Sequence, residues 1–209
     1  MLTKPAFVAI CLLGLCSVAL GHIEMIQPPP RHSRYNPTFK GDPDWNMNFP
    51  LSADRFPFPC RGYEQGGVVQ TVKAGDSIDV NLSGGAKHSG GHCQFSLSFD
   101  NAKTFVSIMD VMDDCVIAAM SYRIKIPTSA PSSKNVLFAW SWVNKVGNRE
   151  YYMNCADIEI QGTIGGSITG PQMLVVNYPG YPTIPEFPHP GQDTGKKLFD
   201  DRPIITIRP

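Results

Sequence analysis

Short segments in which apolar and polar residues alternate are the feature that most limits how this chain can fold. In the clearest of them, Ile78, Val80 and Leu82 alternate with polar residues. Similar segments, separated by Gly, Pro and Ser, span residues 77–82, 93–99, 122–126 and 136–142. A period of two is typical of strands, and no stretch has the pattern of a long amphipathic helix. The chain is therefore predicted to be all-β, an immunoglobulin-like or fibronectin-like antiparallel β-sandwich.

Two segments do not follow this alternation. Residues 28–63 contain eight prolines and many aromatic residues. They are predicted to form one long irregular loop, and long structured loops in compact domains are usually functional. Residues 181–209 are rich in Pro and Gly and are predicted to form an extended C-terminal tail. The sandwich domain is accordingly assigned to residues 22–180.

Residues 1–21 have the features of a secretory signal peptide. Lys4 supplies a positive charge, residues 7–15 are nearly all apolar, and Ala19 and Gly21 place small side chains before a cleavage site. Cleavage after Gly21 would leave His22 as the first residue of a secreted, extracellular chain. No later run approaches the roughly 18 apolar residues that a membrane span needs.

The charge balance argues against two classes of partner. The chain carries 18 Lys and Arg against 18 Asp and Glu, and the predicted signal peptide contains Lys4 and no acidic residue. The mature chain would therefore be nearly neutral, with no electrostatic reason to bind nucleic acid or an anionic membrane. We expect a monomer that binds neither.

Four cysteines remain after the predicted signal peptide, namely Cys60, Cys93, Cys115 and Cys155. An even number of cysteines in a secreted chain is typical of disulfide bonds. Two disulfides are therefore predicted.

A glycine-rich loop between two predicted strands contains His88 and His92. Its glycines allow the backbone to approach another group closely. A zinc site would use both histidines and Cys93, but it would leave an odd cysteine in a secreted protein. His88 as an ordinary polar turn residue is the other interpretation of this loop taken alone.

Three segments together resemble the lytic polysaccharide monooxygenases, most closely the chitin-active auxiliary-activity family eleven. The resemblance covers His22 to about Asn177. Its specific parts are His22 followed by Gln27-Pro28, the block Ala86-x-His88-x-Gly90-Gly91-x-Cys93-Gln94, and the block Asn148-Arg149-Glu150-x-Tyr152-Met153-Asn154-Cys155-Ala156.

The chemistry of two of these residues fits copper. At a free N-terminus, His22 offers its α-amine and its ring Nδ1 as a chelating pair, and His88 adds a second imidazole. Three nitrogens with an open fourth position suit tetragonal Cu(II) better than tetrahedral zinc. The α-amine loses its proton easily because its reference pKa is only about 7.7 to 8.0. We expect one copper ion per chain.

The resemblance also implies roles for two further residues. Tyr152 matches the tyrosine on one axial side of the copper, although its neighbour Tyr151 leaves open which ring lies there. Glu150 shares the strand parity of Tyr152, so its carboxylate would hydrogen-bond an oxygen species near the metal. His92 departs from the family pattern and is expected to be a solvated loop residue or a contact to polysaccharide.

The reaction that the resemblance implies is oxidative cleavage of glycosidic bonds in a crystalline polysaccharide, chitin in this family. It would need an external electron donor and O2 or H2O2 as co-substrate. Because a crystalline substrate is flat, the site should lie at an exposed surface, and groups of the 28–63 loop are candidates to share that surface.

Two structural predictions complete this interpretation. We expect the disulfides Cys93–Cys115, which closes a local loop beside His88, and Cys60–Cys155, which ties the long loop to the strand of Tyr152. On one regular strand, Tyr152 and Cys155 would point to opposite faces. A bulge near Asn154 is predicted to resolve this.

Two other classes of function stay open. A non-catalytic copper-binding protein on the same fold would keep His22 and His88, whereas a structural or adhesion sandwich would need neither. The presence of Glu150 and Tyr152 favours the enzyme.

Overall fold

The computed structural model describes residues 22–209, so the predicted signal peptide lies outside the described residues. Among these residues no helix is both long and apolar enough to cross a membrane. The strands are β1 (Ile23–Gln27), β2 (Gln70–Lys73), β3 (Ser77–Gly84), β4 (Gly91–Ser98), β5 (Val106–Val111), β6 (Ser121–Lys125), β7 (Ser133–Asn144), β8 (Tyr151–Gln161), β9 (Ile168–Pro171) and β10 (Ile204–Ile207). The helical elements are a 3-10 turn, η1 (Cys60–Gly62), and a helix, α1 (Lys196–Asp200).

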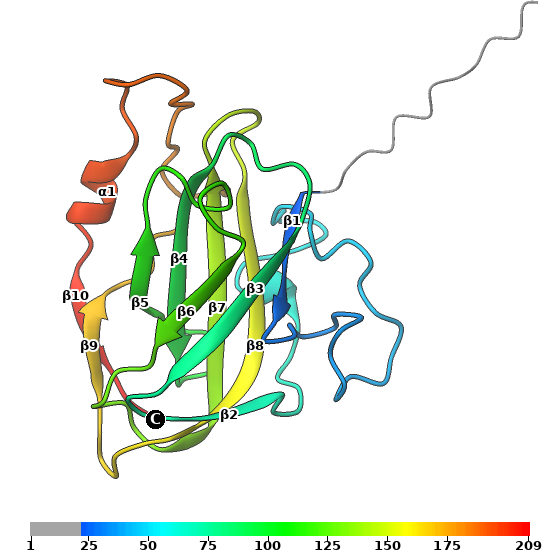
Figure 1. Cartoon of the computed structure of the whole chain (residues 1–209), viewed down its shortest axis with the longest axis vertical. Coiled ribbons are helices and arrows are strands. Elements are labelled where there is room, and N and C mark those ends of the chain that lie inside the picture. The colour runs from blue at the N-terminus through cyan, green and yellow to red at the C-terminus, as the bar shows by residue number, and fades with distance from the viewer. Residues whose placement is uncertain (1–21) are drawn as a thin grey trace, which may run out of the picture.

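Two sheets face each other and form the sandwich (Figure 1). One has the order β1-β3-β6, the other has the order β2-β8-β7-β4-β5, and β9 pairs with β10 in a small third sheet. The predicted all-β sandwich is confirmed, and four of its strands, β3, β4, β6 and β7, fall on the alternating segments. One pair departs from the antiparallel pattern, because β2 runs parallel to β8.

Strand β8 is buried on both faces, which explains how Tyr152 and Cys155 share one strand. Tyr152 packs into the apolar core between the two sheets. Tyr151 and Cys155 face the other way, into a second apolar cluster under the long loop and the C-terminal segment. The register of β7 with β8 runs unbroken from Val136↔Ile158 to Val143↔Tyr151. The predicted bulge near Asn154 is therefore wrong, because both faces of the strand have a core to enter.

The long loop is tied to this outer face of β8. The disulfides Cys60–Cys155 and Cys93–Cys115 are both present, as predicted. The buried guanidinium of Arg31 pairs with the carboxylate of Asp157, which follows Cys155 on β8. A loop of this length is thus held by a covalent bond and a buried ion pair.

Residues 181–209 also pack on the domain, over the same apolar cluster as the long loop, and the ring centroid of Tyr181 lies 5.9 Å from that of Phe58 (Figure 1). They contain α1 and β10 in addition to irregular backbone, so the segment has more regular structure than an extended tail. Ile184, Phe187 and Phe199 are buried in the second apolar cluster. The C-terminal segment therefore forms part of the cover over the five-stranded sheet.

Candidate metal centre

His22 immediately precedes β1 and is placed by the pairing of β1 with β3. Ile23 lies opposite Gly84, the last residue of β3. The φ angle of Gly84 is +140°, and a Cβ there would overlap the carbonyl oxygen of His22. The side chain of Asn154 on β8 also holds this strand, since its Oδ1 accepts a hydrogen bond from the Met25 amide at 2.8 Å. Only glycine allows the two strands to approach so closely beside His22.

His88 lies in the loop between β3 and β4, with a φ angle of +46°. Its carbonyl oxygen accepts a hydrogen bond from the amide of Val146, in the loop that connects β7 to β8. Gly147 in the same loop lies against the ring, and a Cβ there would be 3.0 Å from Nδ1 of His88. Two loops far apart in sequence thus fix the orientation of this imidazole.

Glu150 and Tyr152 reach the same place from the start of β8. The Tyr152 hydroxyl donates a hydrogen bond of 2.6 Å to Oε2 of Glu150. The Glu150 amide donates to the side chain of Asn144, the last residue of β7, at 3.2 Å. The side chain of Asn144 in turn donates to the carbonyls of Val146 and Asn148, so this buried amide organises the turn that presents Glu150.

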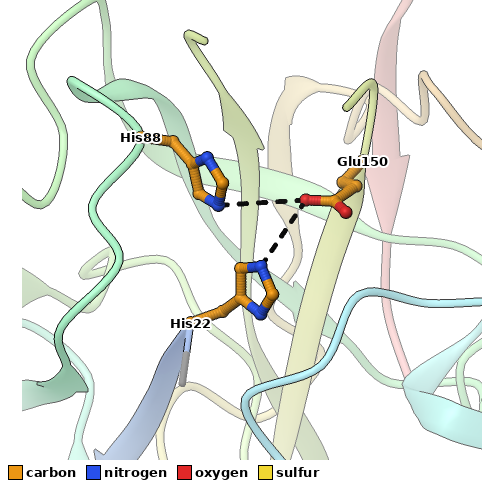
Figure 2. A group of neighbouring side chains, drawn as sticks. All are labelled: His22, His88 and Glu150. Atoms are coloured by element: carbon orange, nitrogen blue, oxygen red, sulfur yellow. Dashed lines mark ion pairs between the residues drawn. The ribbon is translucent and has the colours of Figure 1, made fainter. Parts of the chain in front are cut away.

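The side chains of His22, His88 and Glu150 converge at one point (Figure 2). Each offers a ligand atom within 4.8 Å of the others, and Nε2 of each histidine lies 4.0 Å from Oε2 of Glu150. The two imidazole rings stack with centroids 5.1 Å apart. Their side chains are 30% and 20% exposed, so the centre opens at the surface.

The electrostatics favour the neutral, metal-binding form of His22. Burial lowers its pKa, and the charge of His88 lowers it further, while Glu150 raises it. Burial and the hydrogen bond to Glu150 raise the pKa of Tyr152. Tyr152 therefore stays a neutral phenol, which is a weak metal ligand compared with an imidazole.

The donor set fits a bound metal ion. Nε2 of His88 is buried and has no hydrogen-bond partner among residues 22–209. A buried polar atom without a partner is costly, so each such atom calls for an explanation. Metal–nitrogen distances of about 2 Å would allow one ion to lie between atoms spaced as these are.

Of the predicted site residues, the structure brings together His22, His88, Glu150 and Tyr152. Nε2 of His22 lies 4.0 Å from Oε2 of Glu150. The predicted α-amino ligand depends on cleavage after Gly21, outside the described residues. Tyr152 faces the centre, with its ring centroid 5.5 Å from that of His22. Tyr151 lies on the opposite face of β8 and donates to the carbonyl of Leu174.

The expectation for His92 is wrong, because this residue is buried within β4 rather than solvated in a loop. Its Nδ1 accepts a hydrogen bond from the Asp113 amide, and its Nε2 lies 2.8 Å from the Thr194 carbonyl. Its ring stacks on Phe187. Cys93 is in a disulfide, so His88, His92 and Cys93 form no zinc site.

Sequence reasoning missed the roles of Asn144, Gly147 and Asn154, which shape the site without offering it a ligand. Each acts through a contact between loops or strands that are distant in sequence. The one available signal was chemical, since Asn144 and Asn154 are amides that directly follow apolar residues of β7 and β8.

Comparison with known proteins gives close relatives. The chain is 41% identical over 160 residues to AA11 family lytic polysaccharide monooxygenase A of Aspergillus fumigatus, covering 74% of this chain and 72% of that protein. It is 31% identical to an AA11 family lytic polysaccharide monooxygenase of Aspergillus oryzae, covering 90% of this chain but only 51% of that longer protein. The crystal structure of HiLPMO9B aligns with a TM-score of 0.44 and 17% identity, over 59% of this chain and 67% of that one. No family model matches the chain.

Proposed function

The chain belongs to the AA11 family of lytic polysaccharide monooxygenases, and we propose that it oxidises crystalline chitin at a copper centre held by His22 and His88. Enzymes of this family are copper-dependent and cleave polysaccharides oxidatively. The finer parts of the proposal are the histidine ligands, one copper per chain, and chitin as the substrate.

The observation that carries the proposal is the unpartnered Nε2 of His88. This atom is buried beside the ring of His22 and 4.0 Å from the Glu150 carboxylate. A buried imidazole nitrogen without a partner calls for an explanation, and a structural or adhesion role supplies none. A metal ion bound to this nitrogen, to the ring of His22 and to the α-amine of a cleaved chain would supply that partner. Imidazole and amine nitrogens with an open position suit copper.

Bound copper would supply the one-electron redox chemistry that activates O2 or H2O2 for attack on a sugar C–H bond. The chain's own residues would bind and orient the co-substrate. Tyr152 donates to Oε2 of Glu150 and so fixes the carboxylate, while Oε1 stays available to accept a hydrogen bond. Glu150 is thus placed to hold or release a proton at an oxygen co-substrate. Tyr152 closes one side of the centre with a neutral ring.

An aromatic surface beside the centre supports a polysaccharide as the substrate. Phe49 of the long loop lies edge-on to His22, with ring centroids 6.3 Å apart. Trp45, on the same stretch of loop, is 67% exposed. The buried guanidinium of Arg61 holds this stretch, because it donates to the carbonyls of Asn46 and Phe49. Exposed apolar side chains that gather on one part of the surface are typical of a binding surface.

The remaining parts of the proposal concern setting and partners. We propose a secreted, monomeric enzyme that receives electrons from an external donor. The signal-peptide pattern and the cleavage-dependent α-amine support secretion, because any residue before His22 would convert the amine into an amide.

The first test compares two forms of the protein by titration calorimetry with Cu(II). A chain that begins at His22 should bind one Cu(II), and a chain with one extra N-terminal Gly should bind far more weakly because the chelate is lost. His88→Ala should also lose affinity, whereas His189→Ala, which removes an exposed histidine outside the centre, should not. Equal binding by the extended and cleaved forms would refute the N-terminal site.

The second test is mass spectrometry of soluble products from solid chitin. Copper-loaded protein with a reductant should release oxidised chito-oligosaccharides, and His88→Ala should release none. Tight copper binding without oxidised products from either chitin allomorph would instead support the non-catalytic copper-binding protein.

A further inference from the structure

We propose that Arg149 is a positioning residue that, together with Glu186, clamps loop 145–150 between the C-terminal segment 184–187 and His88. The clamp would fix His88 and Glu150 in the orientation that the metal centre needs. The functional part of this inference rests on the proposed copper centre, but the clamp itself is a property of the metal-free chain.

The guanidinium of Arg149 joins the loop to the C-terminal segment. It donates to the carbonyl of Asn144, at the end of β7, at 3.1 Å and to that of Gly147, within the loop, at 3.2 Å. In segment 184–187 it donates to the carbonyls of Ile184 and Pro185, at 3.4 and 3.2 Å. A planar fork of five donors is suited to several acceptors at once, which a lysine could not match.

Three further contacts join the same two segments. The Gly147 amide donates to the carboxylate of Glu186, and the Phe187 amide donates to the carbonyl of Lys145. The side chain of Asn177 bridges the two, because it accepts from the Ile184 amide at 2.8 Å and donates to the Glu150 carbonyl at 3.4 Å. The backbone on both sides of Arg149 is therefore connected to segment 184–187.

The inner side of the loop meets the metal centre directly. The Val146 amide bonds to the carbonyl of His88, and Gly147 lies against the His88 ring. The loop then ends at Glu150, whose carboxylate lies 4.0 Å from both histidines. A shift of the loop would thus displace both the backbone that contacts His88 and the carboxylate of Glu150.

The C-terminal segment is itself anchored, as a clamp requires. Ile184 and Phe187 are fully buried, and Phe187 stacks on His92 with ring centroids 4.8 Å apart. The ammonium of Lys145 also contacts this ring and lies 5.6 Å from the Phe187 ring centroid. Because this anchor is buried, Arg149 ties the loop to a packed part of the domain.

The test uses hydrogen exchange of the Val146 amide, measured by NMR in the metal-free protein that begins at His22. Arg149→Met should raise the exchange rate of Val146 about tenfold, because the loop loses the hydrogen bonds that Arg149 donates to Ile184 and Pro185. The control is Arg202→Met. Arg202 also lies within residues 181–209, but it pairs with Asp110 of β5, away from the metal centre. Glu186→Ala removes a single exposed acceptor and gives a milder variant if Arg149→Met unfolds.

Copper then reports whether the clamp positions the ligands. Arg149→Met should weaken Cu(II) binding about tenfold and change its EPR spectrum, the scale expected for partners that orient metal ligands. Arg149→Lys should have Cu(II) affinity and an EPR spectrum intermediate between those of the wild type and Arg149→Met. Unchanged Val146 exchange in Arg149→Met and Glu186→Ala would overturn the proposal, as would equal acceleration by Arg202→Met. Failure of the wild type to bind copper would overturn the proposed function and leave the exchange result intact.

Discussion

The Tyr152 hydroxyl donates a hydrogen bond of 2.6 Å to Oε2 of Glu150, the same oxygen that lies 4.0 Å from Nε2 of His22 and of His88. The two residues therefore act as one unit. Burial and this bond keep Tyr152 protonated, and the phenol in turn fixes one carboxylate oxygen. A substitution of either residue should therefore alter the position of the other side chain.

Glu150→Gln and Tyr152→Phe should both bind Cu(II) close to wild type, because neither removes an imidazole or amine nitrogen. Glu150→Gln should lower the turnover rate by about 10- to 100-fold, since it removes the carboxylate that orients the oxygen co-substrate. Tyr152→Phe should have a smaller effect, because the carboxylate of Glu150 is still present. Calorimetry and the rate of H2O2 production with ascorbate separate binding from turnover. A loss of copper affinity in Glu150→Gln would instead make this carboxylate a ligand.

Gly147→Ala should weaken copper binding, although Gly147 is not itself a ligand. The new Cβ would lie 3.0 Å from Nδ1 of His88 and push the ring. The variant should also lose about 1 kcal/mol of stability, because φ at this position is +102°. Gly180→Ala is the matched control, since its φ is +87° but no atom lies within 4 Å of the added methyl. Equal copper affinity in the two variants would show that the contact with His88 is unimportant.

His92 should make the fold less stable in acid. Burial lowers its pKa, and its Nδ1 must be unprotonated to accept from the Asp113 amide. The unfolded chain therefore binds the proton more tightly, so the free energy of unfolding falls as the pH drops below about 6.5. His92→Gln should reduce the loss of stability between pH 7.5 and pH 5.5. Urea titrations of both proteins at the two pH values measure this difference, and identical losses would contradict the prediction.

Trp45→Ala should weaken adsorption to solid chitin and leave copper binding unchanged. The indole is 67% exposed on the long loop that also carries Phe49 beside His22. Ile164→Ala is the control, because Ile164 is even more exposed but lies in the connection between β8 and β9. Depletion of protein from solution by chitin gives the measurement. If both variants adsorb like the wild type, the polysaccharide contacts another surface.

Sequence reasoning succeeded where a local pattern carries the physics. Alternation in β3 places Ile78, Val80 and Leu82 in the core, and the strand is where it was expected. The motifs around His88 and Tyr152 indicated residues that the fold brings together. Both kinds of signal lie within a few neighbouring positions of the chain.

The errors arose where a second layer covers the five-stranded sheet. Gln94 and His92 are polar and lie on β4, yet both are buried because distant segments supply their partners, Leu174 just after β9 and Thr194 in the C-terminal segment. In the same way Cys155 has a core of its own on the outer face of β8. A pattern of polarity along one strand cannot reveal a cover that comes from a distant segment.

The clamp on loop 145–150 also sets the order in which the centre can be assembled. Ribosomes deliver the chain from the N-terminus, so both histidines and Glu150 emerge before residues 184–187. A nascent chain would therefore hold every side chain of the centre while the support of its last loop is still missing. If that loop sets metal affinity, the chain acquires full affinity only late in its synthesis, and a product truncated before residue 184 would carry the ligands without the support.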